Sequence, residues 1–551
     1  MKDLIGRAIH RLSYGILACG VALASLPASG AKAAGPSASV VEPYGRVEVA
    51  KLPSFRPSAG SAIILPRKFP NVDVLAAQKA AFLPTGAHKP DKGGGGGGGH
   101  GKPTPTPTPT PAPTPTPVPT TSASFAGLQF SDSGGWVPPD TILAAGPTYI
   151  FEAVNLAGRI ADKNGNTVST FSLFNFFNLP TSTELTDPRV LFDPSSGRWF
   201  VVTTTVNKSK TPGGWNLAVS ASSDPTGAFY LYSFSTGKSF PDFPKMGVNY
   251  DKLALSGDIF SGNNFLGTEF LVLNKSNLIN GQAVSADTYP APQGDYAIEP
   301  ALDLTENTTS DTMYMAAAAY ASASSVEVWS VTGVPGVGSG SQVTEKSLPF
   351  SSAAYTGPAT PSTLSTPPDA AQCNTNTTVV TNDNALLDAM YRSGSLWVSA
   401  NDACTPETDT AVRSCLRFIE ISIPAGASAA NASIAENFDV GVHGEYLYYP
   451  AVRTDKYGNM ASVFSESSGS QCPSVAEITQ QAGGTPGSPA LVNPGSAAYT
   501  QANRWGDYSG ASVDPTDDST FWLAAEYATT EPCSSGQCSA WGTWINSATA
   551  P

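Results

Sequence analysis

Val190-Leu-Phe-Asp-Pro-Ser-Ser-Gly-Arg-Trp-Phe-Val-Val202 is the stretch of this 551-residue sequence that decides the fold. A first apolar run reaches Asp193-Pro-Ser-Ser-Gly197, whose residue types favour a tight turn, and a second apolar run follows. The pattern predicts two short antiparallel strands joined by the turn. One such hairpin does not identify a fold, so its recurrence along the chain matters.

The same strand–turn–strand pattern occurs seven times, which indicates an internal repeat. The predicted hairpins are Thr141–Val154, Val190–Val202, Met246–Ser256, Ala301–Ala316, Asp388–Ser399, Ala451–Phe464 and Gly510–Ala524. Further strands are predicted after several of them, at Asn216–Ser220, Phe229–Phe234, Thr268–Leu273, Val326–Val331 and Leu416–Ile423. Four short strands per unit, repeated radially, describe a β-propeller blade. The sequence therefore predicts an all-β, seven-bladed β-propeller, with six blades as the alternative, and Phe125–Phe130 is expected to close the ring on the last blade.

The chain before the repeat divides into three segments. Residues 1–34 have a positive start, an apolar run from Leu12 to Leu26 and Ala31-Lys-Ala33, which together predict a secretory signal peptide. Residues 35–92 are rich in Pro and Ala and are expected to have little order beyond one short helix at Val72–Phe82. Residues 93–122 contain seven consecutive glycines and a Pro-Thr run, typical of a linker. The propeller is expected to span residues 123–551, and no later run is apolar enough to span a membrane.

Cysteine usage agrees with export from the cytoplasm, to the periplasm, the cell surface or the medium. Six cysteines remain after the signal, and an even number in an exported chain predicts disulfides. Short loops favour Cys533–Cys538 and Cys404–Cys415, which leaves Cys373–Cys472.

The charge is unevenly distributed. Residues 1–122 carry 13 basic and 5 acidic side chains, whereas residues 123–551 carry 17 basic and 39 acidic ones. An acidic body repels polyanions, which excludes binding to a nucleic-acid backbone. The body also has a single histidine, His443, too few for a zinc site built on two or three histidines.

Acidic residues mark the start of the innermost strand in five of the predicted units. These candidates for catalysis are Asp140, Asp187, Asp242, Glu299 and Asp507. Because innermost strands surround a central channel, the carboxylates are expected to converge at its mouth. Converging carboxylates raise one another's pKa, as a general acid requires, while another stays ionised as base or nucleophile. The same ring of oxygens suits Ca²⁺, and the third interpretation is that each acid only caps its own loop.

Basic and aromatic residues near the same strands are candidates for substrate binding. They are Arg189, Arg392, Arg453, Arg504 and Tyr508. A guanidinium group binds a carboxylate through two parallel hydrogen bonds, although pairing with a neighbouring Asp or Glu is the alternative in so acidic a body. Tyr508 is expected either to stack on a sugar or to pack under Trp505.

Several motifs carry a resemblance to a known family. Pro138-Pro-Asp140, Asp187-Pro188, Ser222-Ser-Asp-Pro-Thr-Gly-Ala-Phe229 and Arg504-Trp-Gly-Asp-Tyr-Ser-Gly510 resemble exported bacterial β-propellers of the sialidase-like, Asp-box type, over residues 125–548. Ser222, Asp224 and Phe229 match the family's Asp-box with Gly227 one place late, and Ser512-Val-Asp514 through Trp522 is a looser match. The chain has no Arg-Ile-Pro motif, the family's carboxylate-binding signature, and has Arg159-Ile-Ala161 instead. The resemblance therefore implies the architecture and not sialidase activity.

Three functions remain open from the sequence. The first is an exported propeller, a monomer, that recognises a saccharide or another surface polymer and acts on it as a glycoside hydrolase or a lyase through the channel-mouth acids. The second is a non-catalytic propeller for adhesion or protein binding, and the third is a calcium-stabilised structural module. A filled channel, or acids each satisfied by local groups, would favour the second.

Overall fold

The computed structural model describes residues 35–55, 57, 62–65, 67–82, 119–206, 212–291, 295–305, 312–352, 361–533 and 536–551. The predicted signal peptide and most of the predicted linker lie outside these residues. Among the described residues, no helix has both the length and the apolar composition needed to cross a membrane.

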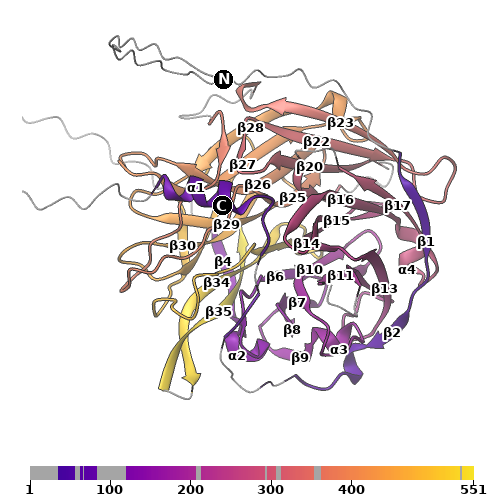
Figure 1. Cartoon of the computed structure of the whole chain (residues 1–551), viewed down its shortest axis with the longest axis horizontal. Coiled ribbons are helices and arrows are strands. Elements are labelled where there is room, and N and C mark those ends of the chain that lie inside the picture. The colour runs from indigo at the N-terminus through magenta and orange to yellow at the C-terminus, as the bar shows by residue number, and fades with distance from the viewer. Residues whose placement is uncertain are drawn as a thin grey trace, which may run out of the picture.

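Seven blades, each with four antiparallel strands, form the body around a central axis, and three of the sheets have a fifth strand (Figure 1). Blade 1 consists of β6 (Ile142–Ala145), β7 (Tyr149–Val154), β8 (Ala157–Asp162) and β9 (Thr167–Ser172). Blade 2 consists of β10 (Leu185–Asp193), β11 (Arg198–Thr205), β12 (Gly213–Ser220) and β13 (Ala228–Gly237). Blade 3 consists of β14 (Phe240–Val248), β15 (Lys252–Ser261), β16 (Asn264–Asn274) and β17 (Val284–Pro290). Blade 4 consists of β18 (Asp295–Pro300), β20 (Met313–Ala319), β22 (Ser325–Thr332) and β23 (Gln342–Pro349).

The remaining blades follow the same order. Blade 5 consists of β25 (Leu386–Arg392), β26 (Ser395–Cys404), β27 (Arg413–Ser422) and β28 (Ser433–Val440). Blade 6 consists of β29 (Tyr446–Thr454), β30 (Met460–Ser467), β31 (Ser474–Gln480) and β32 (Ala490–Asn493). Blade 7 consists of β33 (Gly510–Val513), β34 (Thr520–Cys533), β35 (Gly536–Thr549) and β4 (Thr120–Gln129). The seven-bladed prediction is confirmed and the six-bladed alternative is wrong.

The ring closes through β4, which precedes blade 1 in sequence but pairs with β35, with Phe125 opposite Ile545. Buried Glu152 of blade 1 fixes this closure, because it accepts hydrogen bonds from the Leu128 amide (3.0 Å) and the Thr543 hydroxyl. The expected pairing of Phe125–Phe130 with the last blade is therefore confirmed. It removes the exposed sheet edges that an open ring would have.

Apolar side chains pack between neighbouring blades. Blades 2 and 3, for example, share a buried cluster that includes Leu191, Phe200, Leu217, Leu255 and Leu273. The innermost strands bury both faces, one against each neighbouring blade, and accordingly β10, β14 and β25 are buried along their whole length. This packing explains the continuous apolar runs in the sequence.

The shorter elements connect the blades or lie outside them. They are β1 (Ser37–Val41), β2 (Gly45–Glu48), β3 (Ile63–Ile64), β5 (Trp136–Val137), β19 (Leu302–Asp303), β21 (Ser322–Ala323), β24 (Leu364–Ser365), α1 (Val72–Ala80), α2 (Phe130–Ser133), α3 (Leu173–Phe176), α4 (Lys275–Ile279) and the 3₁₀ turns Val49–Lys51, Phe350–Ser352 and Ala429–Asn431. The fourth hairpin differs from the prediction, because its innermost strand β18 ends at Pro300 and β19 joins blade 5 beside β25.

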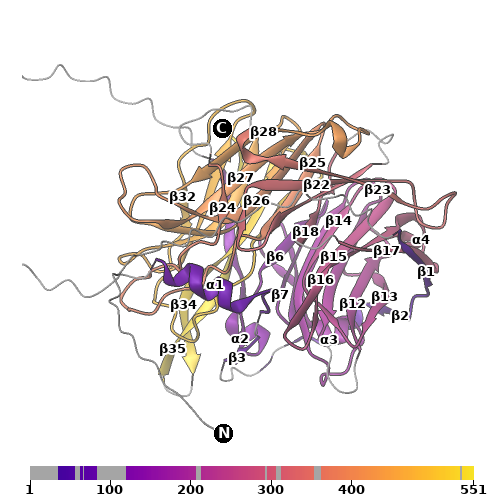
Figure 2. The same ribbon diagram turned by 45° about the horizontal axis from the view of Figure 1, so that its top comes forward.

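The segment expected to have little order before the linker is built onto the propeller. β1 adds a fifth strand to blade 3 and β2 adds one to blade 2, while β3 pairs with β5. In Figure 1, β1 and β2 follow the outer rim, whereas α1 lies inside the outline of the ring, and Figure 2 shows α1 from another side. The expectation for the described part of residues 35–82 is therefore wrong, although the short helix at Val72–Phe82 is confirmed as α1. Unpaired backbone groups at blade edges bind an extended chain whatever its sequence, so the amino-acid composition of this segment did not indicate that it would be ordered.

Three disulfides link Cys373 to Cys472, Cys404 to Cys415 and Cys533 to Cys538, as the sequence predicts. They indicate an oxidising environment, in agreement with export.

Candidate functional site

The innermost strands begin at one end of the ring, which we call the channel mouth. Each of blades 1 to 6 has one residue there with a positive φ: Asp140 (54°), Asp187 (54°), Phe243 (53°), Ala297 (49°), Asn382 (53°) and Tyr449 (62°). Four of these residues lie where the register between the first two strands shifts, as in a β-bulge. Left-handed backbone costs a non-glycine residue roughly 1–3 kcal/mol and is often found at functional sites, where bulges redirect side chains. At this mouth the redirected side chains include acids.

Three of the predicted acids meet at the mouth, where carboxylate oxygens of Asp140, Asp187 and Asp507 lie within 4.8 Å of one another. Asp242 lies beside them, because the amide of the next residue, Phe243, donates a hydrogen bond to Asp187 at 3.1 Å. All four side chains are buried. The predicted convergence therefore holds for four of the five acids.

Glu299 is the exception, and its predicted position at the mouth is wrong. The bulge in β18 lies between Tyr296 and Glu299, as the bulge in β14 lies between Asp242 and Lys245. Tyr296 therefore occupies the position of Asp242, and Glu299 that of Lys245, one layer deeper in the channel. There the Glu299 carboxylate pairs with the Lys245 ammonium at 2.6 Å.

The acids at the mouth differ in the direction of their pKa shifts. Burial, followed by the charges of Asp507 and Asp187, raises the pKa of Asp140 well above its ordinary value. Burial also raises the pKa of Asp242 well above its ordinary value, and Asp187 adds to the effect. Burial alone would raise the pKa of Asp507 too, but the guanidinium groups of Arg504 and Arg67 lower it overall. The lowered pKa of Asp507 keeps it ionised at neutral pH, whereas the raised pKa values of Asp140 and Asp242 favour their uncharged forms.

Local groups satisfy most of the acid oxygens. Asn155 donates to Asp140 at 2.5 Å, the Phe243 amide donates to Asp187 at 3.1 Å, and the Lys68 amide donates to Asp242 at 2.9 Å. Oδ1 of Asp140 has no hydrogen-bond partner among the described residues.

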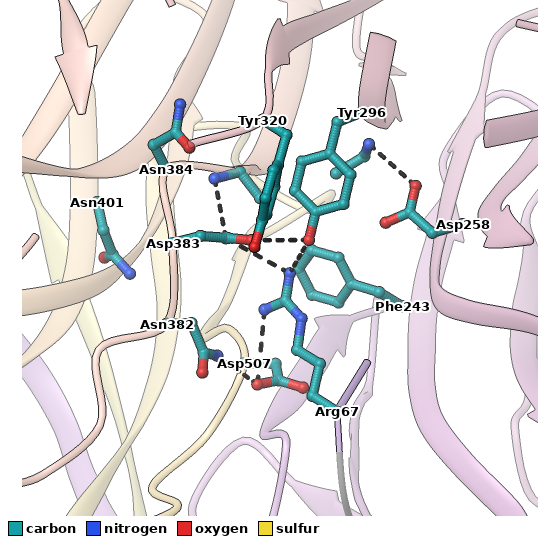
Figure 3. A network of polar contacts seen from close by, with 12 residues as sticks. Arg67, Phe243, Asp258, Tyr296, Tyr320, Asn382, Asp383, Asn384, Asn401 and Asp507 are labelled. Atoms are coloured by element: carbon teal, nitrogen blue, oxygen red, sulfur yellow. Dashed lines mark hydrogen bonds and ion pairs between the residues drawn. The ribbon is translucent and has the colours of Figure 1, made fainter. Parts of the chain in front are cut away.

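Arg67 fills the centre of the mouth, and sequence analysis did not identify it (Figure 3). Its guanidinium donates to the Tyr296 hydroxyl at 3.0 Å and lies 3.6 Å from carboxylate oxygens of both Asp383 and Asp507. The same group lies 3.6 Å from the centre of the Phe243 ring. Arg67 comes from the segment before the linker. The excess of basic residues in that segment was the one available signal.

The predicted substrate-binding residues occupy three different places. Arg504 is at the mouth and pairs with Asp507 at 2.9 Å. Arg189 and Arg453 lie in the deeper layer, where Arg453 pairs with Asp388 and Arg189 lies 3.5 Å over the Tyr508 ring. A cavity of about 10 Å³, room for about one water, lies among the residues of this layer, including Arg189, Glu299 and Arg453. Tyr508 is buried and donates to the Pro188 carbonyl at 2.7 Å, which leaves its ring no open face for a sugar.

Arg392 lies at the end of β25 and not at its start, so it is at the end of the ring opposite the mouth. Its guanidinium pairs with Asp518 at 2.5 Å and lines a cavity of about 270 Å³ between blades 5 and 6. This blade 5/6 cavity is also lined by Trp397, Tyr457, Glu420, Glu436, Gln480 and Lys456, among others. Sequence analysis missed the cavity, because its walls come from turns and outer strands of two blades.

The polar groups of the blade 5/6 cavity are only partly satisfied. Glu420 and Glu436 face each other directly across β27 and β28, and Gln480 donates to Glu436 at 2.7 Å. Burial raises the pKa of Glu436, and the charge of Glu420 adds to the effect. Oε1 of Gln480, a buried side chain, has no hydrogen-bond partner among the described residues. Tyr457, by contrast, is 67% exposed at the rim.

The two Asp-box matches lie at different places in their blades. The turn at Ser222–Phe229 joins the third and fourth strands of blade 2, as a turn between outer strands should. Asp514 lies between β33 and β34, the first two strands of blade 7, so the expectation of a second Asp-box there is wrong.

No family model and no curated protein matches the chain. Among solved structures, a protein of unknown function from Dyadobacter fermentans is 9% identical and aligns over 66% of this chain and 95% of its own, with a TM-score of 0.33. An α-L-arabinofuranosidase of Fusarium graminearum is 9% identical over 74% of this chain and 92% of its own, with a TM-score of 0.33. A Hadza microbial sialidase is 8% identical over 69% of this chain and 73% of its own, also at 0.33. Scores this low carry no functional inference, and the likeness to sialidase-like propellers is one of architecture.

Proposed function

We propose that this chain is an exported, non-catalytic β-propeller that binds a saccharide of a surface polymer, and that the blade 5/6 cavity is its binding site. The observation that carries the proposal is the composition of this cavity, which combines aromatic side chains, two facing carboxylates and a buried amide oxygen without a partner among the described residues. The occupied mouth supports the non-catalytic part, because Arg67 lies in it and local groups bond most of the acids.

The cavity suits the chemistry of a sugar ring. Its volume of about 270 Å³ is at the small end of ligand pockets, which fits a single ring better than a larger ligand. Sugar hydroxyls donate hydrogen bonds to carboxylates such as Glu420 and Glu436, and they also accept them from amides. The apolar face of the ring packs on an aromatic side chain, and exposed Tyr457 offers such a face at the rim.

A glycan panel with two matched variants tests this proposal. Tyr457→Ala removes the exposed ring at the turn between β29 and β30, whereas Tyr250→Ala removes a ring that is 52% exposed at the equivalent turn of blade 3. We expect the wild type to bind at least one glycan, Tyr457→Ala to lose about tenfold in affinity, which is about 1.4 kcal/mol, and Tyr250→Ala to bind like the wild type. Equal binding by both variants would contradict the assignment of the cavity.

A second candidate function, glycoside hydrolysis at the mouth, is favoured by the opposite pKa shifts of Asp140 and Asp507. A proton donor beside an ionised carboxylate is the pair that glycosidases use, and retaining enzymes hold them about 5–5.5 Å apart. This function requires Arg67 to leave. We therefore expect Arg67→Ala, and not the wild type, to release reducing ends from a polysaccharide panel, and Asp140→Asn to abolish that release. A variant as inactive as the wild type on every polysaccharide would reject this candidate.

A further inference from the structure

Arg67 is bound in the mouth in the way that a protein binds a separate ligand. Its side chain is 1% exposed and is surrounded by Phe243 of blade 3, Tyr296 of blade 4, Asp383 before blade 5 and Asp507 before blade 7 (Figure 3). Only Arg67 among these residues lies outside the propeller sequence. The pocket therefore belongs to the ring, and the group that fills it comes from elsewhere in the chain.

The walls of this pocket are fixed by contacts that do not involve Arg67. The Tyr296 hydroxyl donates to Asp383 at 2.8 Å, and Asp383 also accepts from the Ala385 amide at 3.1 Å. Arg504 and Asn382 both donate to Asp507. Phe243 and Asn382 are held at positive φ, so the backbone positions both residues at an energetic cost. Walls that are organised independently of their occupant are a property of binding sites.

A structural arginine in the same protein looks different. Arg417 is fully buried and donates from Nε to Asp439 at 2.6 Å, from Nη1 to Asn437 at 3.0 Å, and from Nη2 to both the Thr363 carbonyl and Asp402. Arg67 makes a single hydrogen bond, and its Nε and Nη1 have no hydrogen-bond partner among the described residues. Arg67 is thus held by stacking and charge and leaves hydrogen-bonding capacity unused.

The pocket selects a guanidinium group over other cations. A planar aromatic ring on one side and two carboxylates at the edge match a flat, delocalised cation, which stacks better and is less strongly hydrated than an ammonium. From this geometry we infer that the channel mouth is a guanidinium-binding site, that Arg67 is its intramolecular occupant, and that its exchangeable ligand is an arginine side chain of another peptide. The inference does not depend on the proposed saccharide site, which lies at the other end of the ring.

Chemical rescue of full-length Arg67→Ala tests the site. Alanine leaves a space that N-ethylguanidine fills, because this molecule supplies the missing carbons and the guanidinium. We expect Arg67→Ala to lower the melting temperature, and N-ethylguanidine at millimolar concentration to raise it again, saturably and by at least about 1 °C. Ethylammonium and N-ethylurea, which supply only the charge or only the planar group, should have no such effect.

Two variants serve as controls. Arg46→Ala removes an exposed arginine of the same segment, which lies 5.9 Å over the Tyr230 ring, and it should respond to N-ethylguanidine no more than the wild type does. Arg67→Lys keeps the charge without the planar group, so it should melt below the wild type even if Arg67→Ala does not fold. A lysine variant as stable as the wild type, or equal responses to the three small molecules, would overturn the inference.

A fluorescent peptide spanning residues 62–71 tests exchange with another chain. We expect it to bind Arg67→Ala and not the wild type, because in the wild type the site is filled, and the same peptide with Ala in place of Arg67 should bind neither. If N-ethylguanidine restores stability but the peptide binds no variant, the site serves only the chain's own segment, and the exchangeable ligand is rejected.

Discussion

Replacing Asp507 with asparagine should destabilise the protein far more than replacing Asp242, although both are buried acids of the same mouth. Asp507 is ionised and neutralises two guanidinium groups, with Arg504 at 2.9 Å and Arg67 at 3.6 Å. The Asp507→Asn substitution would keep the size of the side chain but leave both cations without their shared counter-charge. Removing one partner of a buried ion pair costs about 3–5 kcal/mol.

Asp242 is the matched control. Burial and the neighbouring Asp187 raise its pKa, which favours the uncharged form, so an amide changes the charge less there than at Asp507. An asparagine oxygen can still accept the hydrogen bond that the Lys68 amide now donates at 2.9 Å. We therefore expect Asp242→Asn to change the free energy of unfolding by less than about 1 kcal/mol.

Thermal unfolding at pH 7 measures both effects. The entropy of unfolding of about 2.1 cal/mol/K per residue amounts to roughly 0.9 kcal/mol/K for the propeller, so 3–5 kcal/mol corresponds to a fall of about 3–5 °C for Asp507→Asn. Asp242→Asn should stay within about 1 °C of the wild type. Equal losses for the two variants, or a larger loss for Asp242→Asn, would refute the assignment of charge at the mouth.

Four further predictions follow from the same structure. Burial raises the pKa values of Asp140 and Asp242, and that of Asp258 to about 6, so above about pH 4 the folded state binds more protons than the unfolded state. The melting temperature should therefore fall from pH 5 to pH 8 in a thermal scan, and it should fall less steeply in Asp140→Asn. An equal slope in the two proteins would contradict the burial argument. If Asp140, Asp187 and Asp507 hold Ca²⁺, adding Ca²⁺ should raise the melting temperature of the wild type. The double variant with Asn in place of Asp187 and Asp507 should show no such rise. The absence of a response in the wild type would reject the calcium-stabilised module. Replacing Cys373 and Cys472 with Ser opens a loop of 99 residues and should lower the free energy of unfolding in urea by about 4–5 kcal/mol. The same replacement of Cys533 and Cys538, which are 5 residues apart, should lower it by about 2 kcal/mol. A reversed order would contradict the loop-entropy account. Mass spectrometry of exported protein should find a mature chain that begins near Ala34, and an intact N-terminus retained in the cytoplasm would reject the signal peptide.

The propeller was predictable because its evidence is local and repeated. Each hairpin carries its own turn residues, as at Asp193–Gly197, and seven similar hairpins leave few alternatives to a radial repeat. Aligning the strand starts also found four of the mouth acids. It misplaced Glu299 because the fourth hairpin was predicted to start at Ala301, whereas its innermost strand β18 spans Asp295–Pro300, so that Tyr296 and not Glu299 is equivalent to Asp242. It placed Arg392 at the wrong end of the ring for a related reason, since hairpin boundaries alone do not show where the innermost strand starts.

The position of Arg67 could not be predicted from the sequence, because its partners lie far from it along the chain. Asp383 and Asp507 lie hundreds of residues away in sequence, on the other side of the linker, and nothing around Arg67 distinguishes it from other basic residues of its segment. The blade 5/6 cavity has the same character, since Glu420 and Gln480 belong to different blades. Sequence patterns report the contacts within a repeat, whereas both candidate sites are built from contacts between repeats.

The uneven charge of the chain acquires a physical meaning from these contacts. Arg67 and Lys79 come from the basic part before the linker, and the charged group of each lies beside acidic groups of the propeller, with Lys79 at 2.5 Å from Asp369. The segment before the predicted linker is therefore bound to the ring that follows the linker. Tethering keeps the effective concentration of the segment high, so that Arg67 can occupy the mouth even if its own affinity is modest. An external arginine peptide has to compete with that local concentration, and weakening the segment at Arg67, rather than raising the peptide concentration alone, is what should open the mouth to it.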